Sequence, residues 1–254
     1  MKILPVLLST LALVSIVSAQ TPAQQKAART VFERFRMLNQ TKKLNTPPAR
    51  AIVTGEAIAY TSNTQLGPIS KPDAFVFPDA THAVTRVQGL SEKGAPIIDV
   101  YFYLTRSGSN WKLSALRTLA LTGITGMVRD QLERKPKLSP KERDELANIH
   151  LLLSLDADLR AHFQRNQAAF ARLATSERQP LSSTELTKLK RQLAFDPSPS
   201  ASEHGDGLEW IIGGTLDNTV GYGYSKSGQL PPISPNEIIW AERLSPHWYL
   251  FRTT

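Results

Sequence analysis

The stretch that decides the fold is residues 97–119, which read IIDVYFYLTRSGSNWKLSALRTL. β-branched and aromatic residues dominate its two apolar runs, and such residues favour strands. The link between the runs, residues 106–110, has the composition of a hairpin turn. Further strand-like runs precede this hairpin at 51–60, 74–77 and 83–87. The sequence therefore predicts an antiparallel meander.

We expect a helix before this meander, over residues 22–40. The apolar residues of this segment recur at helical spacing, and its basic side chains lie mostly on the other side. The dipeptide Pro47-Pro48 marks the end of the helical pattern, because proline lacks a backbone donor and restricts the residue before it.

The C-terminal half repeats the order of helices followed by strands. Capping boxes at 139–142 and 182–185 start two helical patterns, of which the first runs to about residue 175 and leaves open a break near 154–158. Strand-like runs return at 208–212, 219–225, 237–244 and 248–253. We therefore predict an α+β fold with helices packed on antiparallel sheets, in two helix-plus-sheet units at 20–126 and 127–254.

A short internal match leaves a duplication of these units open. A shift of 164 residues places 57–70 on 221–234 with six of the fourteen pairs identical, including the order Gln-Leu-x-Pro-Ile-Ser. When one extra residue is allowed, His82 and His247 also fall opposite one another. We interpret both histidines as turn residues.

The order of elements, with hairpins such as 101–113, resembles the NTF2-like and cystatin-like group of folds. The resemblance implies that a long helix packs in the curve of an antiparallel sheet over 22–121, and again over 139–254. The group contains isomerases, dehydratases and non-catalytic binding modules, so the fold alone selects no function.

The N-terminus is typical of a secretory signal peptide. Lys2 precedes an apolar run over 3–17, and small residues end at Ala19, so we expect residues 1–19 to be removed and the mature protein to be periplasmic or secreted. We expect no transmembrane segment in the mature chain. The chain has no cysteine, which favours a bacterial periplasm or extracellular space over a eukaryotic secretory route.

Charge is distributed unevenly along the chain. Residues 21–50 carry seven basic side chains against one acidic, whereas 196–254 carry three basic against seven acidic. The basic N-terminal helix allows three interpretations: a solvated face that keeps the protein soluble, an attraction to the acidic end of the same chain, or contact with an anionic surface. Lys42 and Lys43 are the residues to replace in a test of the anionic surface. No basic stripe is interleaved with aromatic residues, so nucleic acid is not an expected partner.

The sequence lacks the motifs of common catalytic and cofactor sites. It has no Gly-x-Ser-x-Gly elbow, phosphate-binding glycine loop or dinucleotide fingerprint, and its five histidines have no metal-ligand spacing, so we expect no cofactor and no metal site. Asp99 lies in a strongly apolar strand. We expect it at an edge or outward-facing position; the alternative is burial, which would raise the pKa of its carboxyl. Asp99 and Tyr101 share a strand face and form the candidate catalytic pair if the protein is an enzyme.

Aromatic residues gather near the C-terminus beside acidic ones. We take Tyr222, Tyr224, Trp240 and Trp248 as candidate ligand-binding residues for a protein, peptide or glycan; the alternative is a two-sided sheet whose aromatic side chains are covered by helices. The predicted function is a non-enzymatic binding or accessory module of the bacterial cell envelope. The alternative is a small NTF2-like enzyme, of isomerase or dehydratase type, with a cavity in the N-terminal unit.

Overall fold

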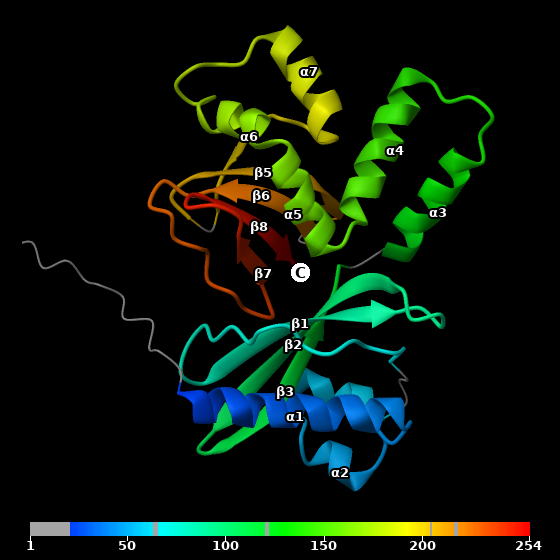
Figure 1. The fold of residues 1–254 in the computed structure, drawn as a ribbon, viewed down its shortest axis with the longest axis vertical. Coiled ribbons are helices and arrows are strands. Elements are labelled where there is room, and N and C mark those ends of the chain that lie inside the picture. The colour runs from blue at the N-terminus through cyan, green and yellow to red at the C-terminus, as the bar shows by residue number, and fades with distance from the viewer. Residues whose placement is uncertain (1–20, 63–65, 120–121, 204, 216–217) are drawn as a thin grey trace, which may run out of the picture.

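The computed structural model describes residues 21–62, 66–119, 122–203, 205–215 and 218–254, and these form two antiparallel sheets with helices packed on them (Figure 1). One sheet has the strand order β1-β2-β3, and the other has the order β4-β5-β6-β8-β7. This arrangement confirms the predicted α+β class. The expected signal peptide lies outside the described residues. None of the helices in the described ranges is long and apolar enough to cross a bilayer.

The first unit consists of one long helix, two short helical segments and a three-stranded meander. Its elements are α1 (Pro22–Gln40), α2 (Pro47–Arg50), the 3₁₀ helix η1 (Gly55–Thr61), β1 (His82–Leu90), β2 (Pro96–Ser107) and β3 (Asn110–Arg117). The expected helix is confirmed, and a capping box between Thr21 and Gln24 starts it. Phe32 and Phe35 of α1 meet Phe102 of β2 at ring-centroid distances of 5.1 and 5.7 Å. These rings fill the space between helix and sheet.

Two of the expected strands are wrong. Residues 51–54 instead form a turn that enters η1, and residues 55–60 lie in η1 itself, because Gly55 has φ +54 and only Val53 bridges to β3. Residues 74–77 make a single bridge, from Val76 to Val84 of β1. Prolines at 68, 72 and 78 remove backbone donors along this segment, so it cannot continue as a regular strand.

The second unit contains five helices and a five-stranded sheet in the described part of the chain. Its elements are α3 (Thr122–Glu133), α4 (Pro140–Leu152), α5 (Asp156–Arg165), α6 (Gln167–Ala174), α7 (Ser183–Leu193), β4 (Ser200–Ala201), β5 (Leu208–Thr215), β6 (Asn218–Tyr224), β7 (Ile238–Arg243) and β8 (Trp248–Thr253). Both predicted capping boxes are present, at Ser139 and Ser182. The long helical pattern breaks between α4 and α5, at the place left open, and again at Asn166.

Helix α3 was not expected from the sequence. Two glycines, at 123 and 126, and a run of charged residues weaken its helical pattern. The boundary expected between 126 and 127 falls inside this helix, and α3 packs beside α4 (Figure 1).

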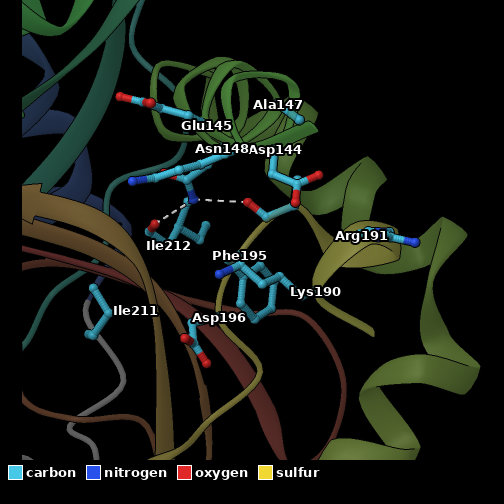
Figure 2. Close-up of a pocket in the computed structure, with 12 residues that line it drawn as sticks. Asp144, Glu145, Ala147, Asn148, Lys190, Arg191, Phe195, Asp196, Ile211 and Ile212 are labelled. Atoms are coloured by element: carbon cyan, nitrogen blue, oxygen red, sulfur yellow. Dashed lines mark hydrogen bonds between the residues drawn. The ribbon is translucent and has the colours of Figure 1, made fainter. Parts of the chain in front are cut away.

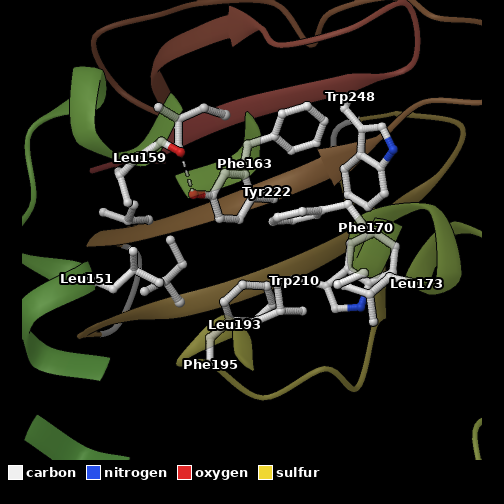
Figure 3. Packing of buried hydrophobic residues seen from close by; sticks show 14 of the residues in the cluster. Leu151, Leu159, Phe163, Phe170, Leu173, Leu193, Phe195, Trp210, Tyr222 and Trp248 are labelled. Atoms are coloured by element: carbon white, nitrogen blue, oxygen red, sulfur yellow. Dashed lines mark hydrogen bonds between the residues drawn. The ribbon is translucent and has the colours of Figure 1, made fainter. Parts of the chain in front are cut away.

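The candidate ligand-binding aromatic residues are mostly core residues. Tyr222 and Trp248 are buried against Phe170, at centroid distances of 4.8 and 5.1 Å, under the helices of the second unit (Figure 3). Trp240 is buried at the junction of the units, and Tyr224 is half-buried beside Trp248. The expected exposed aromatic surface is therefore wrong at Tyr222, Trp240 and Trp248, because helices and the other sheet cover them.

The matched segments of the two units do not share a local structure. Residues 57–61 belong to the 3₁₀ helix η1, whereas the matching residues 221–224 belong to strand β6. The two connections also differ, because Ser70 N donates to Gln88 O whereas Ser234 N donates to Ile238 O. The two matched segments are therefore similar in sequence but not in local structure.

Candidate functional site at the junction of the two units

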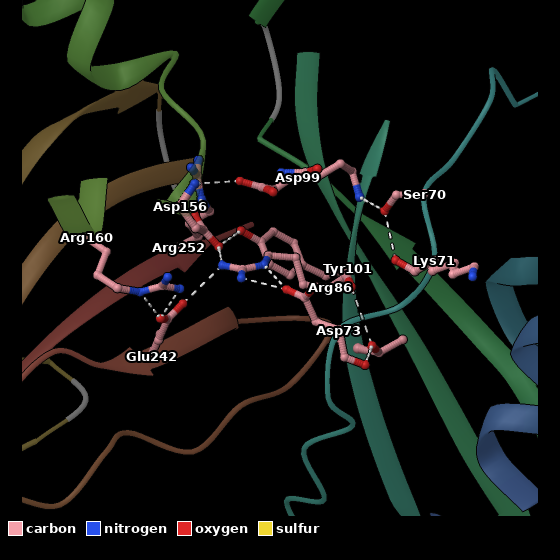
Figure 4. A network of polar contacts seen from close by, with 12 residues as sticks. Ser70, Lys71, Asp73, Arg86, Asp99, Tyr101, Asp156, Arg160, Glu242 and Arg252 are labelled. Carbon is pink, nitrogen blue, oxygen red and sulfur yellow. Dashed lines mark hydrogen bonds and ion pairs between the residues drawn. The ribbon is translucent and has the colours of Figure 1, made fainter. Parts of the chain in front are cut away.

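A network of buried charges joins the two units, and Asp156 lies at its centre (Figure 4). Asp156 is the first residue of α5 and is completely buried. Its Oδ2 accepts hydrogen bonds from Tyr101 Oη at 2.7 Å and Arg86 Nη1 at 3.1 Å, and its Oδ1 accepts one from Arg252 Nε at 2.8 Å. Strands β1, β2 and β8 thus bind one carboxylate at the start of a helix.

The network extends outward through Arg86. This guanidinium forms ion pairs with Asp73 at 2.6 Å and with Glu242 at 3.1 Å. Glu242 in turn accepts a hydrogen bond from Arg160 Nε at 2.6 Å. These contacts leave each guanidinium group of the network with at least one carboxylate.

Trp240 packs inside this polar junction. Its ring stacks on Tyr101 at a centroid distance of 5.3 Å, and the Arg86 guanidinium lies 5.8 Å from its ring centroid. Trp240 Nε1 is buried and has no hydrogen-bond partner among the described residues. The side chain therefore acts as an apolar and cation-binding surface at the junction.

Asp99 and Tyr101, the pair expected from strand alternation, both bind Asp156. Asp99 Oδ2 accepts a hydrogen bond from Asp156 N at 2.6 Å. Phe102 points toward α1, whereas Asp99 and Tyr101 point the opposite way, toward the second unit. Aromatic rings fill the space between α1 and the first sheet, so a pocket beside Asp99 must lie on the other face of that sheet.

The acids of the junction differ in how readily they ionise. Burial, together with the nearby charge of Asp156, raises the pKa of Asp99 to about 6. Burial opposes ionisation of Asp156 as well, but the charges of Arg252 and Arg86 lower the pKa of Asp156 below its usual value. Burial raises the pKa of Tyr101 well above 10, so its hydroxyl stays protonated and donates to Asp156.

A pocket of about 420 Å³ opens beside Asp99. Its walls are the start of β2, helix α3 and the connection between α4 and α5, and Asp99 and Arg252 supply its buried charged groups. Ile97 and Met127 also line it, with exposed fractions of 60% and 72%. The pocket thus combines exposed apolar side chains with a buried carboxyl and a buried guanidinium.

Of the larger pockets that the described residues form away from this junction, one of about 710 Å³ is lined by α7 residues alone, and two contain hydrogen-bonded polar side chains. One of these two, of about 660 Å³, lies between α4, α7 and β5, where Asn148 Nδ2 donates to Ala194 O and Ile212 O at 2.8 and 2.7 Å (Figure 2). The other, of about 620 Å³, includes Glu209, which accepts hydrogen bonds from Ser202 and Tyr249. The hydrogen bonds of Asn148 and Glu209 connect neighbouring elements of the fold.

The histidines that the structure describes make contacts within the fold. Burial lowers the pKa of His162 to about 4, and its Nδ1 lies 3.2 Å from Tyr222 Oη, so the ring is neutral near pH 7. His82 pairs with Asp79 at 2.7 Å, and His247 Nδ1 lies 3.0 Å from Ser225 O. His204 lies outside the described residues. Across the described ranges, no group of three or more His, Asp or Glu side chains is placed to hold a metal ion.

Sequence reasoning did not find Asp156, Arg86 or Arg252. Asp156 lies where the sequence indicated only a helix break, and Arg86 continues an ordinary strand pattern. The sequence did carry one signal for Arg252, because this arginine follows four large apolar residues in the last strand. A charged residue in such a run is buried only when it is paired.

Comparisons with known proteins identify no relative. No protein-family model, curated protein or solved structure matches this chain. The α+β arrangement is compatible with the coarse resemblance to NTF2-like folds.

Proposed function

We propose that this protein is an exported, non-enzymatic binding or accessory module of the bacterial cell envelope, with its ligand site in the pocket beside Asp99. The observation that carries the proposal is the combination of exposed Ile97 and Met127 with buried Asp99 and Arg252 in one pocket. Exposed apolar side chains next to a few fixed polar groups are typical of ligand and partner sites.

The contacts of the junction support binding over catalysis. Tyr101 Oη donates to Asp156, and neither Tyr101 nor Asp156 lines the pocket. Arg252 is held by Asp156 Oδ1 and by Ser154 O at 3.0 Å. These partners keep the polar groups fixed in position, which suits recognition. The second acid among the residues that line the pocket is Asp130, which forms an ion pair with Arg129.

The site is tested by filling the pocket. Gly126 lines it from α3, so Gly126→Phe places a ring in the space, whereas Ile211→Ser removes an exposed apolar side chain elsewhere. We expect hexanol, as an apolar probe, to shift the amide resonances of residues 122–127 in the wild type and in Ile211→Ser but not in Gly126→Phe. Equal shifts in the filled variant would contradict the proposed site.

Export is tested separately by the mass of the mature protein. Expression in a bacterium, followed by intact mass measurement of the periplasmic fraction, should give a chain that begins at Gln20. A full-length protein that stays in the cytoplasm would contradict the export proposal without affecting the pocket.

A second candidate function, a small acid–base enzyme of the NTF2-like type, is favoured by one observation. A carboxyl in a pocket with a pKa near 6 is suited to general-base catalysis. The probe is 5-nitrobenzisoxazole, whose ring opens when a base removes one proton. If the protein is a binding module, wild type and Asp99→Asn should react equally slowly with it. A rate that rises with ionisation near pH 6 and disappears in Asp99→Asn would favour the enzyme.

A further inference from the structure

The charges at the junction do not balance. Among the described residues, the network contains more carboxylates than guanidinium groups, and its members are Asp73, Asp99, Asp156 and Glu242 against Arg86, Arg160 and Arg252. No other cationic side chain of the described chain forms an ion pair with these four acids. One negative charge is therefore left over when every acid is ionised.

Among the described residues, Asp99 is the acid of this network that forms no ion pair with a cationic side chain. Each guanidinium group forms its ion pairs with Asp73, Asp156 or Glu242, whereas the one hydrogen bond that the Asp99 side chain accepts comes from the neutral backbone N–H of Asp156. Asp99 is 5% exposed and lines the pocket. A buried carboxylate without a counter-ion has a high free-energy cost. A ligand that supplies a positive charge lowers this cost, and the difference contributes to its binding free energy.

We infer that the pocket takes a protonated amine with an apolar body, whose ammonium group binds Asp99 while its carbon chain lies against Ile97 and Met127. This inference rests on the proposed binding function and names its ligand class. The volume of about 420 Å³ suits a small molecule or a single side chain.

The other charges around Asp99 do not replace such a cation. The charges of Arg252 and Arg86 favour the ionised form of Asp99, but both guanidinium groups are bound to Asp156, and burial together with the Asp156 charge outweighs them, so the pKa of Asp99 is raised. At the α3 wall of the pocket, Arg129 is paired with Asp130 at 2.7 Å. Ligand binding should therefore favour the ionised form of Asp99 and should weaken when the carboxyl is protonated.

The experiment compares three probes of equal chain length on the full chain: hexylammonium, hexanol and hexanoate. Binding is followed at pH 7 from the amide resonances of residues 122–127. We expect hexylammonium to bind at least about tenfold more tightly than hexanol, since a hydrogen bond to a charged group contributes about 1.5–3 kcal/mol. Hexanoate should bind most weakly. The affinity for hexylammonium should fall about tenfold from pH 7 to pH 5, because Asp99 takes up a proton while the amine stays charged.

Two variants assign the preference to Asp99. Asp99→Asn keeps an oxygen that accepts from Asp156 N, so it should fold, lose the preference for hexylammonium and keep the affinity for hexanol. Glu145→Gln removes an equal charge from the exposed surface of α4 and should change neither. Equal binding of hexylammonium and hexanol to the wild type would overturn the amine inference and leave the pocket proposal intact. Failure of all three probes to bind the folded protein would overturn both.

Discussion

At the residue scale, two buried side chains respond to pH in opposite directions. Asp99 has a pKa of about 6 in the folded protein, above the ordinary value of 3.8, so the folded state binds its proton more readily than the unfolded state does. His162 has a pKa of about 4, below its ordinary 6.5, so the folded state resists its protonation. As the pH falls through the interval between pH 6.5 and 5, Asp99 adds stability and His162 removes it.

Because the two effects oppose each other, the stability of the wild type should depend only weakly on pH. Removing either side chain should make this dependence steeper. Wild-type stability, measured as the urea midpoint at constant ionic strength, should change little between pH 6.5 and 5. Asp99→Asn should become less stable as the pH falls, because the His162 effect remains alone. His162→Gln should become more stable as the pH falls. The same slope in both variants would contradict the assignment.

At the element scale, strand β6 depends on two glycines. Their positions 221 and 223 lie opposite Phe251 and Tyr249 of β8, whose rings cross the strand in the space that side chains would occupy. This crossing lets Tyr249 Oη donate to Glu209 on the other side of β6, at 3.2 Å. The glycines therefore serve close packing, as glycines inside strands often do.

Substitution of Gly223 tests this packing. A Cβ at this position would lie 2.0 Å from the Tyr249 ring, so we expect Gly223→Ala to lower the free energy of unfolding by about 3 kcal/mol. As a matched control, Gly126→Ala in the interior of α3 meets no atom closer than 4.0 Å and should raise the stability by about 0.5–1 kcal/mol. Both values come from urea denaturation. A neutral Gly223→Ala would show that the ring moves without cost.

Helix α1 sets how the basic N-terminal segment can meet an anionic surface. Its apolar side chains are buried on the first sheet, and Lys26, Arg29 and Arg34 remain exposed. Contact with a membrane surface is therefore expected to be electrostatic, without insertion of the apolar face.

Vesicle sedimentation measures this contact. Vesicles that contain phosphatidylglycerol should bind the protein in about 0.05 M salt and release it in about 0.5 M salt. The higher salt shortens the screening length to roughly one third, which weakens attraction between exposed charges. Lys42→Asn with Lys43→Gln should weaken binding, by about 1 kcal/mol per lysine. Asparagine is chosen at 42 because this position has φ +56. Binding that persists in high salt would contradict an electrostatic contact.

At the scale of the whole molecule, the Asp156 network makes the two units dependent on each other. Arg86 and Tyr101 come from the first sheet, whereas Asp156 and Arg252 come from the second unit, and all four side chains meet at one carboxylate. Removing one partner of a buried ion pair leaves the others as uncompensated buried charges.

The wild type should therefore unfold in one calorimetric transition. Asp156→Ala should lower the free energy of unfolding by about 3–5 kcal/mol and separate the two units into distinct transitions. The control, Glu33→Ala, breaks the partly exposed pair with Arg36 and should cost less than about 1 kcal/mol. A single unshifted transition in Asp156→Ala would contradict the role of the network.

Local patterns were enough to predict many elements. The helix at 22–40, the hairpin around residue 108, the capping boxes at Ser139 and Ser182 and the strands near the C-terminus depend on periodicity, caps and turn residues, which act within a few residues. The 3₁₀ turn after Gly55 and helix α3 were missed, because glycine and mixed charge give no clear period. The pairing of Asp99 with Tyr101 followed from strand alternation alone.

The amino-acid sequence by itself determined the α+β class, most element bounds and the shared face of Asp99 and Tyr101, because these depend on neighbours along the chain. Only the tertiary structure decided that Asp156 and Arg252 meet that face, and that Tyr222 and Trp248 are core rather than surface. Arg252 lies 96 positions from Asp156, and no local pattern carries information over such a separation. Contacts of this kind arise when whole sheets and helices bury their apolar faces against one another, and packing then sets which charges pair.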